Sequence, residues 1–364
     1  MHERLGASMT PFAGWLMPLR YTSETAEHLA VRRAAGLFDL SHMGEITVSG
    51  PAAGAALDYA LVGNLSALRP GRARYTMICA EDGGVLDDLV VYRLGDAEFL
   101  VIANAANTAV VLGALRARAA GHDAEVADAT QDYALVAVQG PEAAAILAPL
   151  TGLDLGEIRY YAGSFGDVAE RRAWVARTGY TGEDGFEVFC RPEDAEAVWD
   201  ALAAGGAGAG LIPAGLAARD TLRLEAGMPL YGNELGPDVT PFEAGLGRVV
   251  KFDKPGEFVG REALAARASS GPVKRLAGLT IDSRRIARHG YPVLADGHEH
   301  GTVTSGAPSP TLGVPIAMAY LDPGIGDPDS GEQAGDDHEL SVGIRGQAVP
   351  AHITDLPFYR RRQD

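Results

Sequence analysis

The sequence predicts an α+β protein with a separate all-β domain at its C-terminal end. A length of 364 residues favours two or three domains. Helix and strand patterns are mixed in the first two thirds, without the regular alternation of a doubly wound parallel sheet. Beyond Gly271, short strand-like runs lie between Gly, Pro and Asp turns, which favours a small barrel or jelly roll.

The N-terminal part begins with a helix signal. Ser23 and Glu27 before an apolar pattern, with Gly36 after it, predict a helix over 24–35. The turn residues 81–84 predict a hairpin between strands at 73–80 and 85–94. The other elements expected up to residue 119 are a strand at 45–49, a helix from Gly50-Pro51 through Leu61, a strand at 98–103 and a helix at 107–119.

A similar order resumes after residue 130. The elements expected there are strands at 133–138, 168–177 and 186–190, a helix after Gly140-Pro141, and helices at 192–203 and 214–224. The Gly/Ala-rich segment 205–210 follows a helix and lacks the spacing of a dinucleotide-binding fingerprint, so a flexible loop is expected. The strands expected in the last domain are 276–281, 302–304, 316–320, 340–344 and 349–353, with a polar surface loop at 322–337.

Composition excludes several functions. The formal net charge of −17 argues against a nucleic-acid surface and against attachment to anionic membranes. The longest apolar stretch, 99–115, is interrupted by Asn104 and Asn107, and the N-terminus lacks the pattern of a signal peptide. Cys79 and Cys190 lie far apart in strand-like runs, which favours buried free thiols. We therefore expect a cytoplasmic protein.

Common catalytic and metal-binding signatures are missing. The sequence has no Gly-x-Ser-x-Gly elbow, no phosphate loop and no His-Glu-x-x-His helix. His298 and His300 follow a turn and are expected to be solvated, so no metal site is predicted. His42 is equally compatible with a structural and a functional role.

The pair Asp87-Asp88 stands out because it lies in the middle of an apolar strand pattern. Side chains alternate along a strand, so the two carboxylates face opposite sides. Aspartate is a poor strand former, and a buried carboxylate is costly unless it is paired. At least one of the two must reach a polar site or an ion pair. The ordinary alternative is a carboxylate on an edge strand, or a partner for Arg74 or Arg93. Periodicity does not say which aspartate is the special one.

Two further segments are unusual. Glycines three residues apart in 177–187, between two strands, indicate an irregular loop that carries Tyr180 and several acids. Arg219 and Arg223 are four residues apart and therefore lie on one helix face. Either Asp220 and Glu225 neutralise them, or an anionic ligand does, since arginine binds carboxylates in bidentate fashion.

Together these segments resemble the aminomethyltransferases of the glycine cleavage system, the T-protein family. The likeness runs nearly end to end, and no single motif carries it. The segments concerned are 12–15 with 17–18, 38–39 with 41–44, 83–88, 104–107, 139–141, 177–187, 215–225, 230–232, 304–306 with 309–312, and 357–358.

The resemblance implies a three-domain cloverleaf around a central folate channel. Two mixed α/β domains with ferredoxin-like or Greek-key elements would be threaded discontinuously. The expected division is 1–46 with about 130–155 and 228–270, then 47–129 with about 156–227, and finally 271–364 as the barrel or jelly roll. The implied reaction moves an aminomethyl carbon from the lipoyl arm of H-protein to tetrahydrofolate, releasing ammonia and forming 5,10-methylenetetrahydrofolate and dihydrolipoyl H-protein.

The resemblance also assigns residues. Asp88 would be the catalytic group, facing folate N10 and stabilising charge there. Glu187 would hydrogen-bond the pterin, and Arg219 would meet the glutamate carboxylate. A C-terminal arginine among 360–362, taken as Arg362, would also reach the ligand. The residues that would line the channel are Met43, Tyr75, Tyr92, Tyr160 and Tyr180.

Some features depart from the family pattern, and two other functions stay open. Thr10-Pro11 stands where a hydrophobic residue and an aspartate are expected, and 327–337 looks inserted. One rival is a tetrahydrofolate-dependent demethylase with a sulfur, oxygen or nitrogen methyl donor. Another is a non-enzymatic folate-binding protein of iron–sulfur assembly, whose Lys-Gly-Cys segment is replaced here by 177–180. A pure scaffold would leave the Asp88 strand unexplained.

Overall fold

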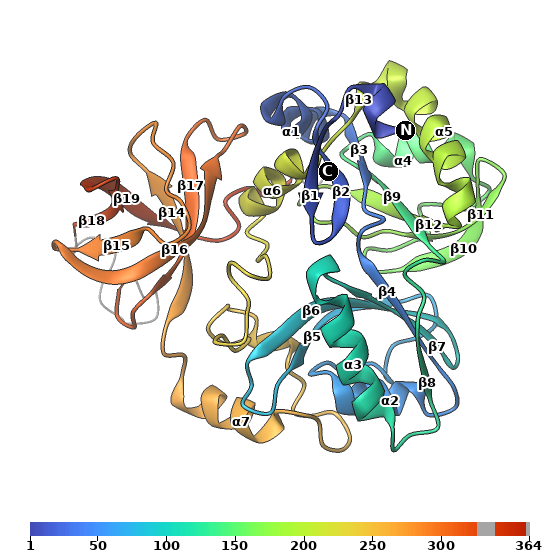
Figure 1. Ribbon diagram of the computed structural model, residues 1–364, viewed down its shortest axis with the longest axis horizontal. Coiled ribbons are helices and arrows are strands. Elements are labelled where there is room, and N and C mark those ends of the chain that lie inside the picture. The colour runs from blue at the N-terminus through green and yellow to red at the C-terminus, as the bar shows by residue number, and fades with distance from the viewer. Residues whose placement is uncertain (326–338, 362–364) are drawn as a thin grey trace.

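The computed structural model describes residues 1–325 and 339–361. It has three lobes arranged around a central region, as Figure 1 shows. The first two lobes are mixed α/β and the third is a closed barrel, which confirms the predicted fold class. Among the described residues no helix is long and apolar enough to cross a membrane.

The first lobe is built on a six-stranded sheet of order β10-β11-β12-β9-β3-β13. Only the β13–β3 pair is parallel. The strands are β3 (Ala35–Asp39), β9 (Ala134–Gln139), β10 (Gly163–Val168), β11 (Arg171–Ala176), β12 (Gly185–Cys190) and β13 (Leu211–Pro213). The helices are α1 (Glu24–Arg33), α4 (Ala143–Leu147), α5 (Ala195–Gly206) and α6 (Leu216–Glu225), and a hairpin is formed by β1 (Ser8–Phe12) and β2 (Trp15–Arg20). The α1 start was predicted, and the Ser23 side chain accepts a hydrogen bond from the Ala26 N–H at 3.2 Å.

The second lobe is a five-stranded antiparallel sheet of order β5-β6-β7-β4-β8. Its strands are β4 (Gly44–Ser49), β5 (Ala73–Cys79), β6 (Val85–Gly95), β7 (Glu98–Ala103) and β8 (Glu125–Asp128), and its helices are α2 (Ala53–Ala60) and α3 (Thr108–Ala119). A core that includes Ile46, Leu57 and Val101 joins the sheet to these helices. Helix α7 (Arg261–Ser270) lies between this lobe and the barrel in the chain.

The C-terminal domain is a closed six-stranded barrel rather than a jelly roll. Its strands are β14 (Arg275–Ile281), β15 (Pro292–Ala295), β16 (His298–Pro308), β17 (Pro315–Leu321), β18 (Leu340–Ile344) and β19 (Gln347–Thr354). Helix α6 lies between the barrel and the first lobe (Figure 1). The predicted surface loop 322–337 falls mostly outside the described residues.

Sheet pairing divides the chain differently from the expected domain boundaries. Strand β12 pairs with β9 along its whole length, from Gly185 with Gln139 to Cys190 with Ala134. Strands β10–β12 therefore share a sheet with residues 35–39, not with 47–129. The expected boundaries differ from this sheet because β12 pairs with β9, which is far away in the sequence, and local patterns do not reveal such pairing.

Local differences also occur. The predicted strand 168–177 is the second half of a hairpin, whose turn at Ala169 and Glu170 has positive φ angles of 49° and 64°. The predicted loop 205–210 begins as the end of α5 and continues as the 3-10 turn Ala207–Ala209. The hairpin β1–β2 and helix α7 were not expected.

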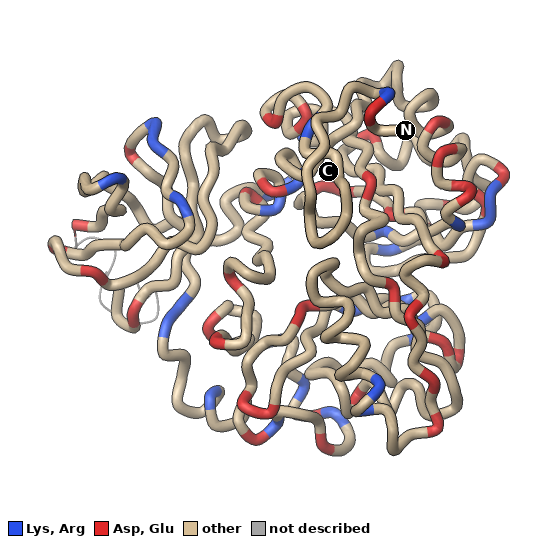
Figure 2. Tube along the Cα trace, in the orientation of Figure 1, with Lys and Arg blue, Asp and Glu red and all other residues tan. Residues whose placement is uncertain are grey.

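Acidic residues outnumber basic ones by 48 to 31. Figure 2 shows both kinds spread over all three lobes. An anionic ligand would therefore depend on individual cations placed in its site.

Candidate functional site

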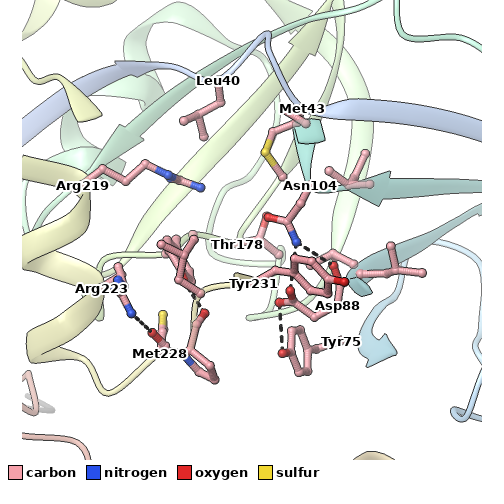
Figure 3. A pocket seen from close by; sticks show the side chains of 18 of the residues that line it. Leu40, Met43, Tyr75, Asp88, Asn104, Thr178, Arg219, Arg223, Met228 and Tyr231 are labelled. Atoms are coloured by element: carbon pink, nitrogen blue, oxygen red, sulfur yellow. Dashed lines mark hydrogen bonds between the residues drawn. The ribbon is translucent and has the colours of Figure 1, made fainter. Parts of the chain in front are cut away.

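A cavity of about 520 Å³ lies between the lobes. Residues from β5, β6, β12, α6 and the loop 227–233 line it. Figure 3 shows Asp88, Tyr75, Asn104 and Tyr231 together at one side, with Arg219 across from them. The predicted site residues among the lining are Met43, Tyr75, Asp88, Tyr92, Tyr180, Glu187 and Arg219.

Asp88 presents its carboxylate to the cavity from β6. The Tyr75 hydroxyl donates to Oδ2 at 3.1 Å, and Asn104 Nδ2 donates to Oδ1 at 2.9 Å. Burial raises the pKa of Asp88 to about 6, and these two hydrogen bonds oppose the rise because they favour the charged form. Asp88 is therefore mostly ionised at neutral pH.

Asp87 faces away from the cavity and is fully buried. It accepts hydrogen bonds from the Asn104 backbone N–H at 3.0 Å, Asn104 Nδ2 at 2.9 Å and Asn107 Nδ2 at 2.7 Å. Arg74 and Arg93 donate instead to backbone carbonyls. The alternative of an ion pair with those arginines is therefore wrong, and of the two aspartates it is Asp88 that lines the cavity.

Glu187 reaches the cavity from β12. The Tyr92 hydroxyl donates to its Oε2 at 3.1 Å, and the Thr178 hydroxyl donates to the same oxygen. Both bonds involve Oε2, so they fix the carboxylate and leave Oε1 for another donor. Thr178 was not singled out from the sequence, although it lies in the unusual segment 177–187.

The two arginines of α6 have different surroundings. Arg223 is buried and pairs with Asp220 at 2.8 Å and Glu234 at 2.9 Å. Arg219 lies 4.8 Å above the ring of Tyr180, and no ion pair joins it to a carboxylate within the described part of the chain. Burial lowers the pKa of the Arg219 guanidinium at the cavity wall, and the charge of Glu187 opposes that shift although the two form no ion pair.

Glu225 does not neutralise these arginines. It pairs with His28 and Arg32 instead. Carboxylate neutralisation therefore holds for Arg223, and an anionic ligand of Arg219 stays a prediction.

Two predicted residues are not found in the lining. Tyr160 is 48% exposed, and its neighbour Tyr161, with a φ angle of 57°, lines the cavity in its place. Arg362 lies outside the described residues. Arg361, next to it, is 3.4 Å from Asp184.

His42, whose role the sequence left open, lines the cavity. Its ring meets Phe12 edge-on at 5.5 Å, and its buried Nδ1 has no hydrogen-bond partner among the described residues. Burial lowers the pKa of His42 to about 4, so the ring is neutral at pH 7. Tyr231 and Asn104 are further lining residues that residue patterns alone did not indicate. No group of three or more His, Cys, Asp or Glu residues that could hold a metal occurs in residues 1–325 and 339–361.

Comparison with known proteins agrees with this architecture. Residues 1–254 match the GCVT N-terminal domain, and residues 274–360 match the glycine cleavage T-protein C-terminal barrel domain. A protein of Saccharopolyspora erythraea named aminomethyltransferase is 63% identical, over 99% of this chain and 96% of its own length. One of Streptomyces coelicolor with the same name is 61% identical, over 100% and 96%.

A solved structure extends this agreement to the fold. The crystal structure of glycine cleavage system aminomethyltransferase T from Bartonella henselae is similar with a TM-score of 0.90 and 36% identity, covering 99% of this chain and 96% of that one. The chain belongs to the glycine cleavage T-protein family. It is thus an enzyme of the aminomethyltransferase class, and the family uses tetrahydrofolate.

Proposed function

We propose that the protein transfers the aminomethyl carbon from the lipoyl arm of H-protein to tetrahydrofolate. The products would be 5,10-methylenetetrahydrofolate, ammonia and dihydrolipoyl H-protein. The observation that carries this proposal is a cavity with the Asp88 carboxylate, held by Tyr75 and Asn104, at one side and Arg219, which forms no ion pair among the described residues, across from it. A cytoplasmic location is part of the proposal.

The residues of the cavity fit a reduced folate. Its volume of about 520 Å³ lies within the usual range of small-molecule sites. Aromatic side chains suit a flat ring system, and the free Oε1 of Glu187 suits the amino-pyrimidine edge of a pterin. Arg219 supplies a cation for the glutamate carboxylate, which answers the difficulty of binding an anion to an acidic protein.

Bound tetrahydrofolate would supply the two nitrogens that accept the carbon. Asp88 would orient the N–H nearest to it and stabilise positive charge that develops there. A fixed carboxylate acts more strongly in a site with little water than in bulk solvent. Tyr75 and Asn104 hold that carboxylate in place.

A donor assay tests the proposal. The enzyme is given aminomethylated H-protein and tetrahydrofolate, and both methylenetetrahydrofolate and ammonia are measured. Formation of the two in equal amounts would support the proposal. Methyl transfer from a small sulfur, oxygen or nitrogen donor, without product from H-protein, would replace it by a demethylase. Tight folate binding with no turnover on any donor would instead favour the non-enzymatic binding protein.

A further inference from the structure

The end of β7 leaves Asn104 beside the catalytic strand. Strands β6 and β7 pair with Val90 opposite Ile102, and continuing this register by two residues brings Asn104 opposite Asp88. Strand β7 stops at Ala103, one residue earlier. Asn104 Nδ2 lies 3.3 Å from the backbone carbonyl of Asp88. The side chain therefore donates to a carbonyl of β6 beyond the last backbone pair with β7.

The carboxamide of Asn104 contacts both aspartates. Its Nδ2 is 2.9 Å from Asp87 Oδ1 and 2.9 Å from Asp88 Oδ1. An amide nitrogen has two hydrogens, so it can donate one to each carboxylate, and the longer contact with the Asp88 carbonyl shares one of them. Asn104 is therefore the direct link between the buried aspartate and the one in the cavity.

Asp87 lies where it can hold Asn104 in contact with Asp88. It is not among the residues that line the cavity, and no ion pair joins it to a cation in the described residues. Its three hydrogen bonds all come from Asn104 and Asn107. A fully buried carboxylate with such partners holds the 104–107 segment against β6.

We propose that Asp87 and Asn104 are positioning residues. Asp87 orients the carboxamide of Asn104, and the second N–H of that carboxamide fixes the carboxylate of Asp88 in the cavity. This inference rests on the role of Asp88 in the proposed function. Neither residue needs to touch the substrate.

A direct consequence concerns the ionisation of Asp88. A hydrogen bond to a carboxylate favours its charged form, so removal of the Asn104 donor raises the pKa of Asp88. The other titratable groups that face Asp88 remain in place: Tyr75, Tyr161, Tyr180, Tyr231 and Asp87.

The test compares Asn104→Leu with Asn107→Leu as the matched control. Asn107 donates to Asp87 but not to Asp88. The pKa of Asp88 is measured by carbon-13 NMR on the full-length, ligand-free enzyme with labelled aspartate, assigned through Asp88→Asn. We expect it to rise by about 1 in Asn104→Leu and much less in Asn107→Leu. This measurement does not depend on turnover, so it separates failure of the inference from failure of the proposed function.

Kinetics supply the second readout. In Asn104→Leu and Asp87→Asn we expect kcat to fall by about 10-fold to 10²-fold, because the carboxylate is misplaced, while the folate Kd changes by less than about threefold. Asn104→Ala, which also removes the donor, replaces the leucine variant if that one unfolds. An unchanged pKa of Asp88 in a folded Asn104 variant would overturn the inference. The inference would also be overturned if the variant lost kcat and thermal stability in parallel while the pKa of Asp88 stayed the same.

Discussion

Asp88 occupies a position where a carboxylate is energetically unfavourable. Burial favours the neutral form, and hydrogen bonds from Tyr75 and Asn104, together with one from the backbone, counter that tendency. The proposed function uses the charge of this carboxylate. Replacing it by the isosteric Asn removes the charge and keeps the volume, so we expect kcat to fall by about 10²–10³, the usual effect of losing one preorganised electrostatic group. Steady-state kinetics with aminomethylated H-protein measures this, and wild-type kcat in Asp88→Asn would contradict it.

The raised pKa of Asp88 also sets a pH dependence. The carboxylate must be ionised to act, and its pKa lies near 6. Activity is therefore expected to be nearly complete above pH ~7 and to fall as the pH drops through about 6. The measurement is kcat/KM for tetrahydrofolate against pH, because this ratio reports the ionisation of the free enzyme. A profile that stays flat down to pH ~5 would show that the ionised form is not required.

Arg219 is predicted to recognise a carboxylate on the ligand. Hydrogen bonds to charged groups contribute about 1.5–3 kcal/mol, so Arg219→Leu should raise the Kd of a pteroylglutamate by roughly 10- to 100-fold. The carboxamide of pteroic acid, which keeps the benzoyl amide and has no carboxylate, is the control ligand and should bind both enzymes equally. Calorimetry gives both constants. An equal loss of affinity for the two ligands would mean that Arg219 acts by packing on Tyr180 and not by binding a carboxylate.

At the scale of elements, the sequence predicted those helices and strands that have signals in neighbouring residues. The β5–β6 hairpin and β7 were found because their turn residues and alternation are local signals. The sheet that β10–β12 join was missed, because pairing with β9 is a long-range choice. The site followed the same rule. The strand pattern marked Asp87 and Asp88, but it could not show that only Asp88 of the two lines the cavity. The Asn104 contact that links them depends on where β7 ends.

The tip of the β5–β6 hairpin offers an element-scale prediction. A Cβ atom at Gly84 would lie 2.0 Å from the carbonyl oxygen of Pro237, and the Val85 N–H bonds the Val239 carbonyl at 2.9 Å. Gly84→Ala therefore has to push the hairpin off the 237–239 segment, and should lower the free energy of unfolding by about 1–3 kcal/mol.

Gly113 is the matched control for that substitution. It lies within α3 with nothing within 4 Å of an added Cβ. Gly113→Ala should stabilise the protein by about 0.5–1 kcal/mol, because alanine is the better helix former. Urea unfolding measures both variants. A neutral Gly84→Ala would show that the 237–239 contact is easily displaced.

At the scale of the whole molecule, Glu225 connects the first lobe to the barrel. At the end of α6 it accepts from His28 and Arg32 of α1, at 3.1 and 3.0 Å, and from Thr311 of the barrel at 2.7 Å. Its backbone carbonyl accepts the Tyr359 N–H at 2.8 Å. Because α6 also carries Arg219, this junction fixes one wall of the cavity relative to the barrel.

The charge of Glu225 makes the stability of this junction depend on pH. Its partners lower its pKa from 4.5 to about 2, despite burial. A lowered carboxyl pKa stabilises the fold fully above the unfolded value, and this contribution is lost as the pH falls from about 4.5 to about 2. Glu225→Gln should lower the free energy of unfolding at pH 7 by about 3 kcal/mol, because Arg32 loses one of its two buried anions. The difference from wild type should shrink across that acid window in calorimetric unfolding. A difference that is the same at pH ~7 and pH ~3 would mean that the variant is destabilised by the altered shape and hydrogen bonding of the side chain and not by the loss of the carboxylate charge.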